Sequence, residues 1–264
     1  MSDPAPRDPA FVQSLERGLA VLRALNTPES QTLSEVAKTT GLSRAAARRF
    51  LLTLDNIGYV EQRQSRFSLT PKVLELGHTY LTSLGLPEVA QPHLERLVRD
   101  VQESSSVSIL DDTDILYVAR VHTRRIMTVS INVGTRFPAW ATSMGRVLIA
   151  DMPADERAAI LDRSALEDFT PSTVGNRAAL EKELDKIARQ GYAIVDQELE
   201  IGLRSVAAPI RRADGKATAA VNLSVQAATT SVKEIRDRLV GPLIETAEAI
   251  SGDLEMVDPS NAED

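Results

Sequence analysis

The sequence predicts an α+β fold in two domains, because its two halves carry different periodic patterns of apolar residues. Helical patterns and one short hairpin pattern fill residues 12–70, whereas strand and helical patterns alternate over residues 88–252. A helical pattern at 71–87 joins them and is interpreted as a linker helix. Polar segments at 1–11 and 253–264 are expected to be a disordered and a flexible tail.

Leucines at helical spacing run from Leu15 to Leu25, and this first helix should end before Pro28. Thr32 opens a second helix, since Thr32 and Glu35 form the capping-box pattern in which each side chain satisfies a backbone amide. Gly41 should end this helix with a positive φ.

A third helix should begin after a Ser43 cap and run to about Asn56. Short strands at 58–60 and 67–69 then flank a polar tip at 63–66. Helix, helix, tight turn, helix and basic-tipped hairpin follow one another in the order of a winged helix-turn-helix. This fold predicts a protein that binds double-stranded operator DNA, although some winged helices make only protein contacts.

The charge distribution supports the DNA interpretation. The whole chain has a net charge of -7, but residues 38–66 hold six Lys or Arg against two Asp or Glu, a local charge of 6 − 2 = +4. Phosphates respond to nearby charges more than to distant charges screened by salt. The candidate DNA-contacting residues lie on the third helix and at the hairpin tip: Ser43, Arg44, Ala45, Arg48, Arg49, Arg63 and Arg66.

The second domain shows two triplets of strand patterns with helical patterns before, between and after them. The strands are expected at 105–111, 115–121, 126–132, 192–197, 203–210 and 217–226. The helices are expected at about 94–101, 142–151, 153–163, 177–190 and 231–251, the last with a kink at Gly241-Pro242. Asp214-Gly215 is typical of a two-residue hairpin turn. The Asp-rich residues 111–114 are typical of a β-turn.

An anion site is expected where the helix at 142–151 begins, because a helix N-terminus offers free backbone amides. Thr142 and Ser143 would add hydroxyl groups there, and Met144 and Leu148 an apolar wall.

Five stretches resemble the IclR family of bacterial regulators: SLERGLAVLRAL, LSEVAKTTGLSRAAARRFLLTLDNIGYV, VGTRFPAWATSMGRVLIA, GYAIVDQELEIGLRSVAAPI and AAVNLSVQ. The resemblance covers residues 12–252 and is closest to the subgroup that controls protocatechuate and β-ketoadipate catabolism. It implies a GAF-like effector-binding domain, a small organic acid effector, and dimers that pair into tetramers.

The resemblance also implies which residues bind the effector: Asp196, Leu203, Ser205, Asn222 and Ser224. Ser205 stands where some members have cysteine and Asn222 where others have serine, so the identity of the ligand does not carry over. Arg204 is our first candidate for the partner of a ligand carboxylate, and Arg136 the second. A surface or interface ion pair is the alternative for each.

Catalysis, a metal site and a cofactor are not expected. The three histidines, His78, His93 and His122, form no i, i+4 pair for zinc, and no G-x-S-x-G nucleophile pattern is present. The chain also lacks cysteine and any apolar run near the roughly 18 residues that cross a membrane, so we expect a cytoplasmic protein. A DNA-binding protein whose second domain only forms oligomers remains the main alternative.

Overall fold

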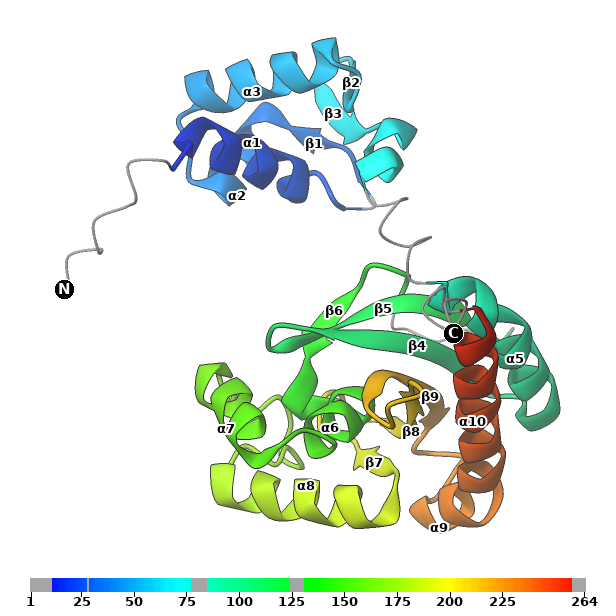
Figure 1. Cartoon of the computed structure of the whole chain (residues 1–264). Helices are drawn as coiled ribbons and strands as arrows, with labels where there is room; N and C mark the ends of the chain where they lie inside the picture. Colours follow the sequence, from blue (N-terminus) through cyan, green and yellow to red (C-terminus); the bar gives the residue numbers. More distant parts are fainter. Residues whose placement is uncertain (1–10, 28, 77–84, 124–130, 258–264) are drawn as a thin grey trace. The chain divides into compact units, whose positions relative to one another are not determined.

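The computed structural model describes residues 11–27, 29–76, 85–123 and 131–257, which belong to two compact units, Met1–Tyr80 and Leu81–Asp264 (Figure 1). Residues 1–10 and 258–264 of the expected tails and residues 77–84 of the expected linker helix lie outside the described residues. Residues 253–257, expected in the flexible second tail, instead continue the last helix of the second unit.

Apart from a short strand between the first two helices, the first unit has the expected order of helices and strands (Figure 1). Its helices are α1 (Gln13–Ala24), α2 (Leu33–Thr40), α3 (Arg44–Asn56) and the 3-10 turn η1 (Pro71–Leu74). Its strands are β1 (Gln31–Thr32), β2 (Val60–Arg63) and β3 (Arg66–Leu69), which form an antiparallel sheet in the order β1-β3-β2. Apolar side chains from all three α-helices and from the hairpin meet in one small core.

Local capping sets the ends of α2 and α3, as the sequence predicts. The Thr32 amide donates to Glu35 Oε2 at 2.6 Å while the Glu35 amide donates to Thr32 Oγ1 at 3.3 Å. Gly41 follows α2 with φ of 66°, which glycine adopts without steric cost. Ser43 Oγ then accepts the Ala46 amide at 3.2 Å and begins α3.

The second unit is built on one six-stranded antiparallel sheet in the order β6-β5-β4-β9-β8-β7. The strands are β4 (Ser104–Asp111), β5 (Asp114–Val121), β6 (Arg136–Pro138), β7 (Ala193–Asp196), β8 (Leu203–Arg211) and β9 (Ala217–Gln226). The helices are α5 (Leu86–Val101), η2 (Ala139–Ala141), α6 (Ser143–Ala150), α7 (Ala154–Arg163), α8 (Arg177–Gln190), α9 (Val232–Glu234), the π-helical segment η3 (Ile235–Leu239) and α10 (Val240–Val257).

Helices cover both faces of this sheet (Figure 1). On one face α5 and α10 pack on residues such as Val107, Val221 and Leu223. On the other face α6 packs on the sheet, α8 packs behind α6, and the core includes Trp140 and Met144. The first turn of α6 therefore lies against the middle of the sheet, which positions the candidate effector site.

Two details of the second unit differ from expectation, and a third prediction lies largely outside the described residues. The strand predicted at 126–132 falls largely on residues 124–130, which lie outside the described residues. The edge strand β6 occupies Arg136–Pro138, where no strand was predicted. Pro138 is tolerated there because it ends an edge strand. Residues 212–216 connect β8 to β9, and within them Arg212 N–H donates to the Lys216 carbonyl at 3.0 Å, so the turn that this bond closes has three residues, 213–215, rather than two.

Candidate functional site

Helix α3 presents one polar and basic face and buries the other. Ala47, Leu51 and Leu54 face the core of the first unit. The five predicted DNA-contacting residues of this segment are all exposed: Ser43, Arg44, Ala45, Arg48 and Arg49. Because a recognition helix must bring such groups to the floor of the major groove, this face is suited to DNA.

The two predicted arginines of the hairpin tip behave differently. Arg63 is largely exposed and lies 3.0 Å from Glu61 in a surface ion pair. Arg66 instead turns back toward β1, where its Nε donates to Ser30 Oγ at 2.9 Å. Arg66 therefore braces the wing while its side chain stays 44% exposed, and the Arg63 side chain is 80% exposed.

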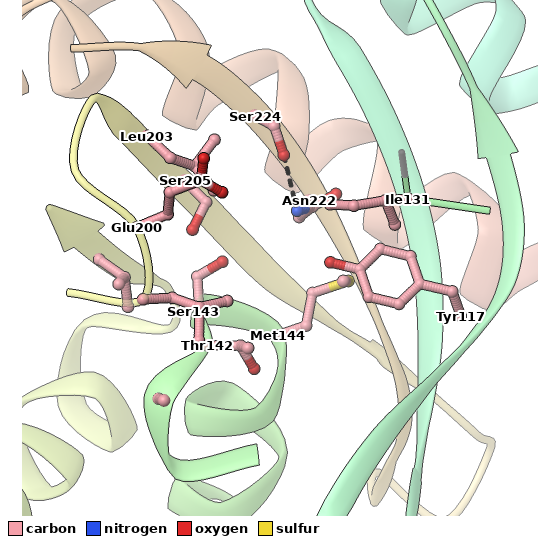
Figure 2. Close-up of a pocket in the computed structure, with 13 residues that line it drawn as sticks. Tyr117, Ile131, Thr142, Ser143, Met144, Glu200, Leu203, Ser205, Asn222 and Ser224 are labelled. Atoms are coloured by element: carbon pink, nitrogen blue, oxygen red, sulfur yellow. Dashed lines mark hydrogen bonds between the residues drawn. The ribbon is translucent and has the colours of Figure 1, made fainter. Parts of the chain in front are cut away.

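A small cavity lies in the second unit between the sheet and the first turn of α6 (Figure 2). Its walls come from that turn, from the β7–β8 loop and from the polar face of the central strands. The lining residues are Tyr117, Ile131, Ala141, Thr142, Ser143, Met144, Val195, Leu199, Glu200, Leu203, Ser205, Asn222 and Ser224. The cavity brings together seven of the ten predicted effector-binding residues from three separate segments of the chain.

The α6 wall combines a helix cap with a free hydroxyl. Thr142 Oγ1 accepts the Gly145 amide at 3.0 Å, so this hydroxyl serves mainly to start the helix. Ser143 points its hydroxyl into the cavity, and Met144 forms the apolar floor beside Tyr117 (Figure 2). Thr142 thus holds the wall in place while Ser143 offers the polar contact.

The sheet wall is polar and ordered by hydrogen bonds. Asn222 accepts the Ser106 amide through Oδ1 at 3.1 Å and donates from Nδ2 to Ser224 Oγ at 3.2 Å (Figure 2). Ser205 on β8 pairs in register with Ser224 on β9. The polar face that the sequence suggested is therefore buried and lines the cavity, since Asn222 is 2% exposed and Ser224 is 5% exposed.

Three predicted effector residues do not line the cavity. Alternate residues of a strand point to opposite faces, so Arg204 points away between the lining residues Leu203 and Ser205. Its Nε donates to Asp196 Oδ1 at 2.6 Å, and its Nη1 donates to two main-chain carbonyls at 2.8 Å. Leu148 packs in the core one turn further along α6. The expected ligand contact of Arg204 is thus replaced by an ion pair.

Arg136, the second candidate for the carboxylate, also has acidic partners. Its guanidinium bonds the carboxylate of Asp111 and lies 3.3 Å from Asp114. Hydrogen bonding to Asp111, and more weakly to Asp114, raises the pKa of Arg136. This arginine ties β6 to the β4–β5 turn.

Sequence reasoning missed a buried ion pair beside the cavity. Arg146 on α6 donates through Nη1 and Nη2 to the carboxylate of Glu198 at 2.8 and 2.6 Å, and through Nε to the Trp140 carbonyl at 2.7 Å. The next residues of that loop, Leu199 and Glu200, line the cavity. An arginine inside the apolar run SMGRVLIA was the available signal, because a buried arginine needs a carboxylate partner.

The lining of the cavity is mainly neutral and polar. Its described residues offer hydroxyls, one amide and one carboxylate, and none of these lining residues is histidine or lysine. Burial raises the pKa of Tyr117 to about 12, so the phenol stays protonated and can donate a hydrogen bond. The volume is about 30 Å³, room for roughly one or two water molecules, so a larger ligand requires the walls to move apart.

The described residues form neither a metal-binding cluster nor a membrane-spanning helix. They contain no group of three or more His, Cys, Asp or Glu side chains that could hold a metal ion. None of the helices formed by these residues is both long and apolar enough to span a bilayer.

Both parts of the chain match known protein families. Residues 14–64 match the family described as IclR helix-turn-helix domain. Residues 78–252 match the family described as bacterial transcriptional regulator IclR C-terminal. The two matches cover most of both structural units.

Individual relatives agree with these matches. The chain is 40% identical to the Pca regulon regulatory protein of Pseudomonas putida, over 90% of this chain and 82% of the relative. The solved structure of a putative transcriptional regulator from Rhodococcus sp. RHA1 is 53% identical, with a TM-score of 0.83 over 94% of this chain and all of that one. An IclR homolog from Microbacterium hydrocarbonoxydans, solved in complex with 4-hydroxybenzoate, is 26% identical with a TM-score of 0.81, over 92% and 99% of the two chains.

Proposed function

The chain belongs to the IclR family of bacterial transcriptional regulators, and we propose on that basis that an aromatic-pathway acid controls its binding to operator DNA. Helix α3 and the wing would contact the DNA, and the cavity beside α6 would take the acid. The observation that carries this proposal is the cavity itself, since it collects hydroxyl, amide and apolar groups from three segments in a unit separate from the basic helix.

The chemistry of the effector is inferred from the relatives and from the cavity. One similar protein is a Pca regulon regulator, and another was solved with 4-hydroxybenzoate. A ring that carries a carboxylate and a hydroxyl matches a lining that is apolar at Met144 and polar at Ser143, Ser205 and Asn222. Protocatechuate and 4-hydroxybenzoate are therefore the ligands to test first, followed by β-ketoadipate, an open-chain acid of the same pathway.

We also propose that the protein works as a homodimer that pairs into tetramers. A groove along α1 exposes apolar side chains, with Leu15 63% and Leu19 46% exposed. Apolar surface of this kind marks a protein interface, and a palindromic operator needs two recognition helices. Replacing Leu15 and Leu19 together by Asp should shift the protein toward monomers in analytical ultracentrifugation.

The variants Arg48→Ala and Arg49→Ala test whether the first unit binds DNA independently of acid binding by the second unit. Each should weaken binding to the protein's own promoter by about 1–3 kcal/mol, because a base or phosphate contact is lost. The heat of binding of the acid should stay unchanged. Arg189→Ala, at an exposed position of α8, removes the same charge from the second unit and should leave promoter affinity as it is.

The outcomes separate the alternatives. If Arg48→Ala abolishes both DNA binding and acid binding, the assignment of separate sites is wrong. If calorimetry finds no heat with any of the three acids while promoter binding persists, the second unit only forms oligomers.

A further inference from the structure

None of the described residues that line the cavity is a cation. A carboxylate ligand is bound most strongly by charge-assisted hydrogen bonds from a cationic side chain. Arg204 and Arg136, the two arginines expected from the sequence, are engaged by acidic side chains. A third arginine, Arg120 on β5, lies on the same face of the sheet as the cavity.

A β-bulge brings Arg120 to this face. Ser106 on β4 pairs with Arg120, whereas Ser108 pairs with Tyr117, so two steps on β4 match three steps on β5. Residues three apart on a regular strand point to opposite faces, but the extra residue cancels that alternation. Arg120 therefore shares the face of Tyr117, which lines the cavity.

Hydrogen bonds connect Arg120 to the sheet wall of the cavity. Arg120 Nη1 donates to Ser106 Oγ at 2.8 Å, and the Ser106 amide donates to Asn222 Oδ1 at 3.1 Å. Ser106 and Asn222 are also register partners of β4 and β9. The guanidinium thus lies two hydrogen-bonded steps from a side chain that lines the cavity.

The charge of Arg120 is not balanced by a carboxylate in the described part of the chain. Its side-chain acceptors there are the Ser106 hydroxyl and, at 3.2 Å, the Nδ1 atom of His122. Burial lowers the pKa of Arg120, and burial together with the charge of Arg120 lowers the pKa of His122, so the imidazole is a neutral acceptor near pH 7. A partly desolvated cation with only neutral partners favours an incoming anion.

We propose, relying on the effector function proposed above, that Arg120 binds the carboxylate of the acid. The carboxylate would lie at the end of the cavity formed by Tyr117 and Asn222, with the ring over Met144. The far polar end of the ligand would then meet Ser143 and Ser205 on the opposite side (Figure 2). Arginine is suited to this role because its planar guanidinium can donate two parallel hydrogen bonds to one carboxylate.

The test pairs a change in the protein with the matching change in the ligand. Calorimetry compares 4-hydroxybenzoate, protocatechuate and the uncharged 4-hydroxybenzamide on the full-length wild type, Arg120→Gln, Arg120→Lys and the exposed control Arg189→Gln. Arg120→Gln should weaken the two acids by roughly 10- to 100-fold, the size of a hydrogen-bonded charge contact, and leave the amide within roughly 2-fold. Arg120→Lys should lose less affinity for the acids, since lysine keeps the positive charge but cannot donate two parallel hydrogen bonds to one carboxylate.

Thermal unfolding shows whether each variant is folded. If Arg120→Gln does not fold, the comparison with the wild type uses Arg120→Lys instead. If the wild type and Arg120→Gln bind the acids equally, Arg120 is not the carboxylate partner, while the effector function stands. Equal loss of the acids and the amide would also overturn the inference, because a general structural defect predicts that pattern. If the wild type binds no acid, the effector function and the role of Arg120 both fall.

Discussion

Arg146 carries its charge inside the core of the second unit, where it is 1% exposed. Such a charge is tolerated only if partners replace the lost water, and here Glu198 and the Trp140 carbonyl satisfy all three guanidinium nitrogens. The Val174 amide donates to the same carboxylate at 2.9 Å. Because Arg146 belongs to α6 and Glu198 to the β7–β8 loop, the pair joins two walls of the cavity.

Removal of the Glu198 charge should therefore be costly. We expect Glu198→Gln to lower the free energy of unfolding of the second unit by about 3–5 kcal/mol, because it leaves Arg146 buried without its counter-charge. Urea denaturation monitored by Trp140 fluorescence, the signal of the single tryptophan, measures this loss. Glu181→Gln breaks a surface pair with Arg177 and should change stability little; equal effects would refute the argument.

Tyr117 makes a pH-dependent prediction at the same scale. Burial raises its pKa to about 12, whereas an unfolded tyrosine ionises near about 10. The raised pKa stabilises the fold fully below about pH 10, and this contribution is lost as the pH rises from about 10 through 12. In a stopped-flow pH jump read at the phenolate absorbance, one tyrosine should ionise near 12 before unfolding, and Tyr117→Phe should lack that step. A native protein in which all tyrosines ionise near 10 would contradict this.

The sequence identified residue types better than residue partners. Hydroxyls at Ser143, Ser205 and Ser224 were predicted at the site and line the cavity. The positions of the arginines relative to the cavity were harder to predict. Strand alternation puts Arg204 on the face away from the cavity, and a β-bulge that the sequence pattern does not reveal puts Arg120 on the cavity face. Long-range pairing with acidic side chains then decides which guanidinium is available, and spacing along the chain does not encode it.

At the scale of elements, the first turn of α6 depends on one glycine. A Cβ atom on Gly145 would lie 2.1 Å from the Ala139 carbonyl oxygen, so α6 can pack against η2 only without a side chain there. That contact fixes Thr142, Ser143 and Met144, which form the α6 wall of the cavity.

Gly145→Ala should consequently damage both the fold and the site. We expect a loss of about 1–3 kcal/mol or more in the free energy of unfolding, together with weaker binding of the acid, because the backbone must shift. Gly252→Ala is the matched control, since Gly252 lies inside α10 with no atom within 4 Å of the added Cβ. That substitution should stabilise by about 0.5–1 kcal/mol through helix propensity. Urea denaturation measures the free energy of unfolding of both variants, and calorimetry measures their affinity for the acid. If Gly145→Ala changes neither quantity, α6 is not packed this tightly against η2.

Elements with strong local signals were predictable, and those set by tertiary pairing were not. The capping box at Thr32, the Ser43 cap and the positive φ of Gly41 define α2 and α3 within the chain itself. Strand β6 has only three residues and exists because it pairs with residues 114–116 of β5. A hairpin signal at Asp214-Gly215 gave the right turn but the wrong loop length, since residue 213 also belongs to the loop.

At the scale of the whole molecule, the proposed function requires coupling between the two units. The acid would bind beside α6 in the second unit and the operator on α3 in the first. The small cavity gives this coupling a physical origin, because a ring-sized ligand must separate walls that Arg146 and Glu198 hold together. Such an opening can favour one arrangement of the protein over another only if the acid binds the two arrangements with different affinities.

Linkage makes this coupling testable in both directions. If the acid changes operator affinity by some factor, typically about 5- to 150-fold, the operator must change acid affinity by the same factor. Promoter titrations with and without acid, and acid titrations with and without promoter, should agree when salt is held constant. In Arg48→Ala, acid affinity without DNA should match the wild type, while the promoter concentration needed to shift it should rise. A specific complex selects one arrangement of the recognition helices, whereas a nonspecific complex does not. If random duplex shifts acid affinity as much as the promoter does, the two sites therefore communicate through charge alone.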